Sequence, residues 1–372
     1  MAQDKLRVAL VGANWGLTHV AAWRSLPDVE LCAICTSRQE TADKVAGSHG
    51  IPAAYASVER MMSEARLDVV DVTPRPSIRA PIAHQVLAHG KHLLQPLPFA
   101  LNLSEGHTLR RVAQEAGLVA MVENLHRYSP SFRQAHDLIR QGVIGEVRTF
   151  AASVRTSILL DPPAGFAYYW LLDPQSGASA LRNFGAHMLH VLEWFLGPAR
   201  CVAARIATHL PLIQKADGST AANGTSDSAV VLLTYDDDVD GTMDISWCRP
   251  GQNSFSLDFV GSRGRIVLEC EGLGPRKAEL YLTDKPHGVS RKLSIDPAYR
   301  QGSTVASQDD TLESLMFMCR AMADAIRSRK PNSVEPNFDD ALRIMETVEA
   351  AYRASAERRW IDVAEFSAAS RR

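Results

Sequence analysis

The chain has 372 residues, a length that suggests about two domains. Its hydrophobic fraction of 46% supports sizeable cores and excludes an intrinsically disordered chain. Lysine and arginine number 40 against 42 aspartate and glutamate, so the formal net charge is -2. This balance gives no field that favours nucleic acid or an anionic membrane, and we expect a small-molecule partner instead.

The amino-terminal residues lead directly into a short apolar stretch at 6–11. A secretory segment needs a longer apolar core and a small-residue cleavage site. No apolar run approaches the ~20 residues that span a bilayer. We therefore expect a cytoplasmic protein without a membrane segment.

Strand-like and helical runs alternate in the first third of the chain. The strand-like runs are 6–11, 29–36, 69–73, 91–94 and 118–122, and the helical runs are 16–25, 39–49, 77–89 and 104–116. Short apolar strands between helices predict a parallel sheet covered on both faces. We place this α/β domain at residues 1–123.

The pattern changes in residues 124–372. Helices are predicted at 129–141, 184–195, 312–329 and 339–358, with an irregular aromatic-rich stretch at 156–182. Strand-like runs follow at 145–155, 202–207, 228–234, 241–247, 254–260, 265–269 and 278–282. Because no long helix separates the last six runs, we predict an α+β domain with a large mixed, mostly antiparallel sheet.

Two of the six cysteines, Cys32 and Cys35, form a CxxC within the apolar run 29–36. Residues three apart on a strand face opposite sides of the sheet, whereas a redox motif needs a helix start. We favour reduced core thiols over a redox pair.

A glycine-containing turn joins the first strand to the first helix. Glycine allows the backbone to approach a pyrophosphate, and the helix N-terminus supplies amides and partial positive charge. The match to GxGxxG is imperfect, because Asn14 replaces the second glycine and Gly16 comes one residue early. A plain tight turn is the alternative, but the position in the chain favours a nucleotide site built from Gly12, Asn14, Trp15 and Gly16.

The second strand ends in Thr36-Ser37-Arg38. An NAD site usually carries an acidic residue there, which binds the ribose hydroxyls. A hydroxyl and a guanidinium suit a 2′-phosphate instead, so Ser37 and Arg38 favour NADP, with NAD possible. Alternatively, Ser37 only caps the following helix and Arg38 is solvated.

In the order of its elements and in several motifs, the chain resembles the Gfo/Idh/MocA oxidoreductases, named after glucose–fructose oxidoreductase and inositol dehydrogenase. The matching segments are 11–19, 71–74, 90–94, 124–130, 183–187 and 358–363. The resemblance implies a Rossmann domain, with Thr73 and Pro74 at the cofactor, and a mixed-sheet domain that lines the substrate site. It also implies hydride transfer between a nicotinamide and a sugar, polyol or related alcohol, and a homodimer or homotetramer.

The resemblance further implies a catalytic lysine in a Glu-Lys-Pro motif after segment 90–94. Here Pro96 stands at the glutamate position and Leu97 at the lysine position. Leucine cannot exchange a proton, so the expected ammonium is absent. Gln95, at the strand end, either orients the nicotinamide amide or a substrate, or forms a buried turn.

A second family motif, Asp-x-x-x-His, is half kept, with Asn183 at the aspartate position and His187 at the histidine position. The two residues lie one helical turn apart and project from the same face. His187 can act as general acid–base, and Asn183 can hydrogen-bond a substrate hydroxyl. A structural histidine is the alternative. A metal site with His190 and Glu193 is disfavoured, because nothing else on the helix completes a coordination shell.

Aromatic residues provide candidate substrate contacts, because their faces suit sugar or ring stacking. Tyr128, Tyr169 and Trp170 are assigned to this role, although the stretch 166–170 could equally be a packed loop. Asn124 opens the second domain and is assigned to the cofactor. Arg127 either holds an anionic substrate or braces the domain junction, and we favour the brace.

Together these features predict an NAD(P)-dependent oxidoreductase that acts on a sugar-like or cyclic hydroxyl or keto compound. Because the family lysine and aspartate are both missing, a non-catalytic cofactor-binding sensor or partner protein is the alternative. Elimination or hydrolysis with a tightly held cofactor is a third interpretation.

Overall fold

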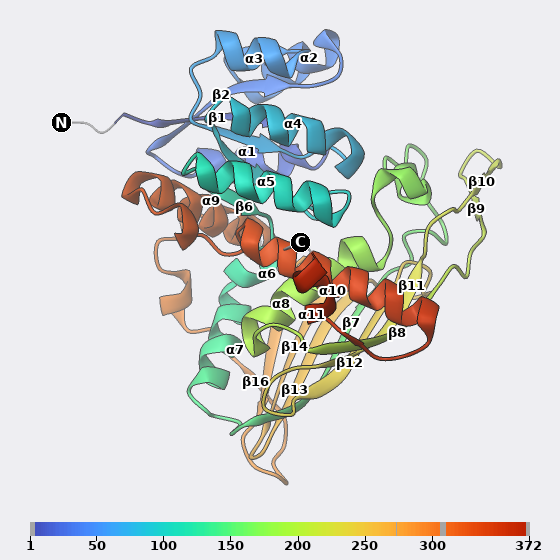
Figure 1. The fold of residues 1–372 in the computed structure, drawn as a ribbon. Helices are drawn as coiled ribbons and strands as arrows, with labels where there is room; N and C mark the ends of the chain where they lie inside the picture. The colour runs from blue at the N-terminus through green and yellow to red at the C-terminus, as the bar shows by residue number, and fades with distance from the viewer. Residues whose placement is uncertain (1–3, 273, 306–309, 370–372) are drawn as a thin grey trace. The chain divides into compact units, whose positions relative to one another are not determined.

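The structure is a computed structural model that describes residues 4–272, 274–305 and 310–369 (Figure 1). Its contacts divide the chain into two units, of which the first consists chiefly of Met1–Glu123 and Leu312–Leu342. The second consists chiefly of Asn124–Gly302 and Arg343–Arg372.

The first unit contains a six-stranded parallel sheet in the order β3-β2-β1-β4-β5-β6. Its strands are β1 (Leu6–Val11), β2 (Val29–Cys35), β3 (Ala53–Tyr55), β4 (Val69–Val72), β5 (His92–Gln95) and β6 (Ala120–Val122). The strand order reverses between β1 and β4, which is where ligands bind at the carboxyl ends of strands in doubly wound sheets. The predicted parallel α/β domain is confirmed.

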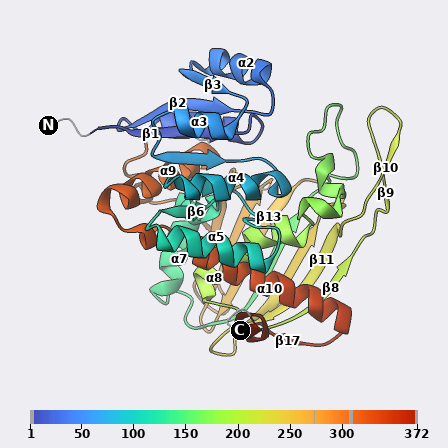
Figure 2. The same ribbon diagram turned by 45° about the horizontal axis from the view of Figure 1, so that its top comes forward.

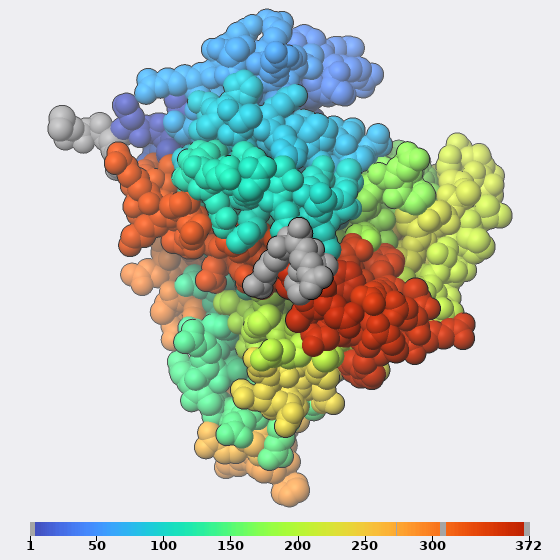
Figure 3. Space-filling model, viewed as in Figure 1, coloured from blue at the N-terminus to red at the C-terminus, as the bar shows by residue number. Residues whose placement is uncertain are grey.

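Helices of this unit are α1 (Gly16–Arg24), α2 (Gln39–His49), α3 (Val58–Glu64), α4 (Pro76–Ala88), α5 (Leu103–Glu115) and most of α9 (Asp310–Ser328). Figure 3 shows the exposed side of α5, in teal. The sequence pattern did not predict β3 and α3, because β3 has only three half-buried residues and α3 is short.

Residues 312–342 were expected in the second domain, but they pack with the parallel sheet. Arg320 of α9 donates to both carboxylate oxygens of Asp28, each at 2.9 Å. The backbone amide of Val122 on β6 donates to the carbonyl of Pro336 at 3.0 Å. These contacts pair segments far apart in the chain, which local periodicity cannot reveal.

The second unit contains a nine-stranded sheet in the order β16-β15-β14-β13-β7-β12-β11-β8-β17. Its strands are β7 (Val147–Arg155), β8 (Cys201–Ala207), β11 (Ser228–Thr234), β12 (Asp240–Ser246), β13 (Ser254–Gly261), β14 (Arg265–Glu271), β15 (Glu279–Thr283), β16 (Arg291–Leu293) and β17 (Ile361–Asp362). Among the strands that the structure describes in this sheet, only β7 and β12 pair in parallel, so the predicted mixed, mostly antiparallel sheet is confirmed. A separate hairpin, β9 (Leu212–Gln214) and β10 (Thr220–Ala222), projects from the end of this sheet (Figure 2).

The helices of the second unit are α6 (Leu125–Tyr128), α7 (Pro130–Arg140), α8 (Ala186–Leu196), most of α10 (Phe338–Glu357) and α11 (Ala364–Ala369). Side chains of β11 alternate between the two faces of the sheet. Val231 and Leu233 are buried, whereas Val230 is 49% and Leu232 is 43% exposed. The sheet therefore has one buried face and one open face.

Both cysteines of the CxxC are free thiols on β2, and both are buried. Burial raises the pKa of the Cys35 thiol to about 11, which makes it a poor nucleophile at neutral pH. This geometry agrees with core thiols. None of the described helices is long and apolar enough to cross a membrane.

Candidate functional site

The turn after β1 is pressed against the end of β4. Gly12 has a φ of +100°, and a Cβ on either Gly12 or Gly16 would lie 2.7 Å from Oγ1 of Thr73. The Thr73 hydroxyl in turn donates to the carbonyl of Val11 at 2.9 Å. Both glycines are therefore required by close packing at the reversal of strand order. This packing accounts for glycine at both positions.

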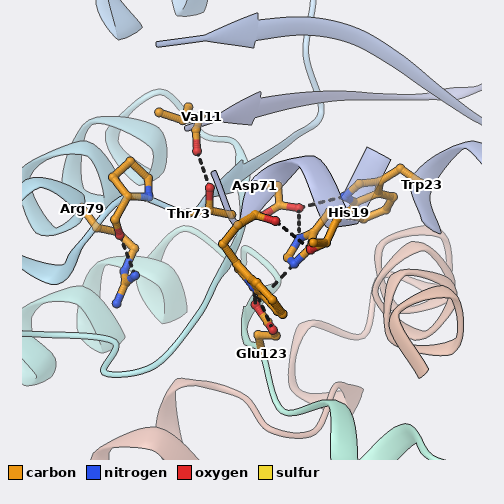
Figure 4. Close-up of polar contacts among 10 residues, drawn as sticks. Val11, His19, Trp23, Asp71, Thr73, Arg79 and Glu123 are labelled. Carbon is orange, nitrogen blue, oxygen red and sulfur yellow. Dashed lines mark hydrogen bonds and ion pairs between the residues drawn. The ribbon is translucent and has the colours of Figure 1, made fainter. Parts of the chain in front are cut away.

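A buried polar network lies beneath this turn (Figure 4). Nδ1 of His19, on α1, lies 2.7 Å from a carboxylate oxygen of Asp71, on β4, and Nε1 of Trp23 donates to the same oxygen at 2.9 Å. Nε2 of His19 lies 3.4 Å from Glu123, which also accepts from Nε1 of Trp15 at 2.8 Å. The network thus ties the first helix and the turn residue Trp15 to β4 and to the end of β6.

The net charge of this network depends on whether His19 is protonated. Burial alone would lower the pKa of His19, but the carboxylates of Asp71 and Glu123 outweigh that effect and raise it to about 10. The ring is therefore protonated at neutral pH, with Nδ1 at hydrogen-bond distance from Asp71 and Nε2 at ion-pair distance from Glu123. Sequence reasoning missed this cluster, although an aspartate inside an apolar strand was an available signal, because a buried carboxylate requires partners.

Ser37 and Arg38 are exposed after the carboxyl end of β2. Arg38, not Ser37, is the N-cap residue of α2, and it makes no side-chain capping hydrogen bond. The hydroxyl of Thr36 donates to the carbonyl of Arg38 at 2.8 Å and holds this turn in place. The capping alternative for Ser37 is thus not the observed geometry, and both side chains are exposed to solvent.

The loop after β5 is closed by Gln95. Its Nε2 donates to the carbonyl of Phe99 at 2.9 Å, while its buried Oε1 has no hydrogen-bond partner among the described residues. Leu97 in this loop is only 5% exposed. Gln95 therefore forms the turn and also keeps one acceptor available, whereas position 97 contributes an apolar side chain to the interior.

The candidate catalytic pair lies in the second unit. The expected helix begins earlier than predicted, with a π-helical turn at Leu181–Gly185 that leads into α8. The amide of Gly185 donates to the carbonyl of Ala180 at 3.0 Å, and a Cβ on Gly185 would lie 2.7 Å from Leu181. Asn183 lies within this turn and His187 in the first turn of α8, and both are half-buried. π-helical turns occur frequently at functional sites.

Asn124 and Arg127 lie in or beside α6 of the same unit. Nδ2 of Asn124 donates to the backbone carbonyl of His187 at 2.9 Å. Its Oδ1 has no hydrogen-bond partner in the part of the chain that is described. The Arg127 guanidinium lies 5.9 Å from the ring centre of Trp194, on α8. Both side chains therefore support the helix that carries His187.

Tyr169 and Trp170 belong to a 3₁₀ turn, Tyr169–Leu172, and are half-buried. The Tyr169 ring contacts Phe166 edge-on, with 5.1 Å between ring centres, and the ammonium of Lys215 lies 5.3 Å from it. This turn is anchored by Thr225, whose hydroxyl donates to the carbonyl of Leu171 at 2.7 Å. The stretch is thus a packed loop whose aromatic side chains retain partly exposed surfaces. Tyr128 ends α6 and is also half-buried.

His190 is fully buried, and its pKa lies well below the ordinary value because of burial first and of nearby cations second. The carboxylate of Glu193 lies 2.7 Å from Nη2 of Arg343. Within the described ranges, no group of three or more His, Cys, Asp or Glu side chains could hold a metal ion.

Comparison with known proteins gives two matches to family descriptions. Residues 6–124 match "Oxidoreductase family, NAD-binding Rossmann fold", and residues 132–267 match "GFO/IDH/MocA C-terminal domain". A levoglucosan dehydrogenase of Pseudarthrobacter phenanthrenivorans is 21% identical, with 98% of this chain and 100% of the relative covered. The scyllo-inositol 2-dehydrogenase (NADP(+)) of Bacillus subtilis is 24% identical, with 93% and 96% covered.

Among solved structures, a levoglucosan dehydrogenase in complex with NADH and L-sorbose has a TM-score of 0.86 at 20% identity. The match covers 97% of this chain and 99% of that chain. At this level of identity the likeness establishes the fold.

Proposed function

Because the chain belongs to the Gfo/Idh/MocA family of oxidoreductases, we propose that it is an NADP-dependent dehydrogenase or reductase acting on a sugar-like or cyclic hydroxyl or keto compound. The proposed cofactor dependence is supported by the turn between β1 and α1, where a Cβ on Gly12 or Gly16 would collide with Oγ1 of Thr73. The substrate class rests on the names of two relatives, a levoglucosan and a scyllo-inositol dehydrogenase.

The preference for NADP rests on the carboxyl end of β2. Ser37 and Arg38 are exposed there, and no acidic residue stands at 36–38 to repel a 2′-phosphate. A relative named with NADP(+) is consistent with this preference, whereas a structural neighbour binds NADH, so NAD is the alternative.

Two features of the first unit support the proposed binding of a dinucleotide. The glycine turn allows backbone amides at the start of α1, from Asn14 to Gly16, to approach the pyrophosphate, with Thr73 and Pro74 beside it. The unpartnered Oε1 of Gln95 can accept a hydrogen bond from the nicotinamide carboxamide. Asn124 remains a further proposed cofactor contact.

The nicotinamide, when bound, supplies or accepts the hydride. In the proposed reaction a ring nitrogen of His187 takes the proton of the substrate hydroxyl during oxidation and returns it during reduction. The side-chain amide of Asn183 donates a hydrogen bond to the same oxygen. Because Leu97 offers no ammonium, hydrogen bonds from these two groups must stabilise negative charge on that oxygen.

The partly exposed aromatic side chains of Tyr128, Tyr169 and Trp170 are proposed to pack against the substrate ring. Aromatic faces suit the C–H faces of sugars and cyclic alcohols. We further propose that the protein is cytoplasmic and forms a homodimer or homotetramer through the open face of the nine-stranded sheet, where Val230 and Leu232 are exposed.

A screen of sugars, polyols and cyclic diols for change in the near-ultraviolet absorbance of the reduced cofactor tests this function. With any substrate so found, His187→Ala should lose ~10²–10⁴-fold in turnover, while cofactor affinity is kept. The matched control is His209→Ala, an exposed histidine of the same unit, which should retain wild-type turnover. Full activity of His187→Ala would mean that another group, such as Tyr128 or Tyr169, moves the proton.

The buried side chain of Leu97 favours a second candidate, a non-catalytic cofactor-binding sensor or partner protein. Cofactor binding without turnover throughout the screen would favour this role, whereas turnover rejects it. Leu97→Lys should not rescue His187→Ala, because burial disfavours the charged form of an introduced ammonium.

A further inference from the structure

Arg79, on α4, is an arginine with only 2% of its surface exposed. Its Nη1 donates to the carbonyl of Pro74 at 2.8 Å, and its Nη2 donates to the carbonyl of Pro98. Its Nε has no hydrogen-bond partner among the residues described. The guanidinium is therefore held by two backbone carbonyls through Nη1 and Nη2, while its Nε–H group is left without a partner among the residues described.

The two carbonyls belong to different loops. Pro74 follows β4, and Pro98 follows β5, which pairs with β4 in parallel. A single side chain thus joins two loops at the carboxyl edge of the sheet. These loops lie beyond the reversal of strand order from β2, in the half of a doubly wound sheet that receives the second mononucleotide. For a nicotinamide dinucleotide, that mononucleotide carries the nicotinamide.

The charge of Arg79 is not neutralised by an ion pair. No carboxylate in the described part of the chain lies within ion-pair distance of it, although Glu123 acts on it from farther away. Burial lowers its pKa to about 9, so the group stays protonated at neutral pH. A buried, unpaired cation is unfavourable for folding, and an apolar side chain would avoid that cost. Leu97, in the loop that Arg79 contacts, carries no charge and so does not neutralise the guanidinium.

We propose that Arg79 is a positioning residue for the nicotinamide half of the cofactor. It fixes the loops after β4 and β5 relative to each other and places a positive charge at that edge of the sheet. The proposal rests on the proposed cofactor dependence. It differs from the role of Arg38, which lies at the opposite, adenosine half of the site.

The test compares Arg79→Met and Arg79→Lys with a control, Arg111→Met, which removes an exposed charge from α5 of the same unit. Isothermal titration calorimetry measures the affinity of the full-length protein for NADPH and NADH, and for their adenosine fragments 2′,5′-ADP and ADP. Arg79→Met should weaken binding of both dinucleotides roughly tenfold or more, and binding of both fragments less than about twofold. Arg79→Lys should be intermediate, because one ammonium does not reproduce a planar fork that bridges two carbonyls.

Equal losses for dinucleotides and fragments would overturn the proposal, since they would indicate a general defect of the unit. Unchanged dinucleotide affinity in Arg79→Met would overturn it as well, while leaving the proposed function intact. A wild-type protein that binds neither dinucleotide would overturn both. If Arg79→Met does not fold, the same ratio of losses measured with Arg79→Lys decides the question.

Discussion

Replacing His19 by asparagine should remove most of the pH dependence of stability near neutral pH. The pKa of His19 is raised from 6.5 to about 10, chiefly because Asp71 and Glu123 outweigh the effect of burial. Between these pH values the folded protein holds a proton that the unfolded chain has lost. Each pH unit therefore lowers the free energy of unfolding by about 1.4 kcal/mol, or about 5 kcal/mol over the whole interval.

The measurement is best made from about pH 7 to about pH 8.5. Below this window, His126 and His190 contribute, because burial lowers their pKa values and stability then rises with pH. Above it, Arg79 begins to titrate, with a pKa of about 9. Within it, urea unfolding followed by circular dichroism should give a wild-type free energy of unfolding that falls by about 2 kcal/mol. The curve for His19→Asn should be nearly flat.

The control is His89→Asn, which replaces an exposed histidine at the end of α4. It should retain the wild-type slope, because the ring lies outside the buried network. Equal slopes for the wild type and His19→Asn would refute the assignment of a protonated imidazole between Asp71 and Glu123.

Three further outcomes are expected. Arg38→Ala should weaken NADPH binding roughly tenfold or more relative to NADH, as measured by titration, and equal losses would contradict a role at the 2′-phosphate. Gly16→Ala should lower the free energy of unfolding by ~1–3 kcal/mol, because the new Cβ meets Oγ1 of Thr73 at 2.7 Å. A second change, Thr73→Ala, should restore part of that loss, and no restoration would mean that the strain lies elsewhere. Val230→Lys with Leu232→Lys should convert an oligomer into a 40.7 kDa particle by light scattering, and an unchanged mass would exclude this face as the interface.

The sequence pattern was sufficient for the class of each sheet and for the long elements, because each long element carries its own periodicity, but not for β3, α3 or the placement of residues 312–342. The strands around Val8, Val70 and Leu257 are runs of apolar or alternating residues, which a sheet requires whatever its neighbours are. The turn at Gly12 was also visible, since its position between the first strand and helix restricts what it can do.

The polar contacts of the site could not be predicted from the sequence in the same way. His19 and Asp71 are 52 residues apart in the chain, and Arg79 reaches a carbonyl 19 residues away. A histidine on a helix and an arginine near a proline have no local pattern that identifies such partners. The π-helical turn at Leu181–Gly185 was missed as well, because π-helical turns are rare and occur mostly as single turns within α-helices, where helical periodicity does not reveal them.

The indole of Trp15 has a consequence for how this protein can be observed. Its N–H group is held by the carboxylate of Glu123, and the ring lies edge-on to His19 with 6.0 Å between ring centres, next to the glycine turn. Indole emission depends on the charges and hydrogen bonds around the ring. We therefore expect that cofactor binding at the proposed nucleotide turn changes the emission of Trp15, one of the six tryptophans of the chain, without any attached label.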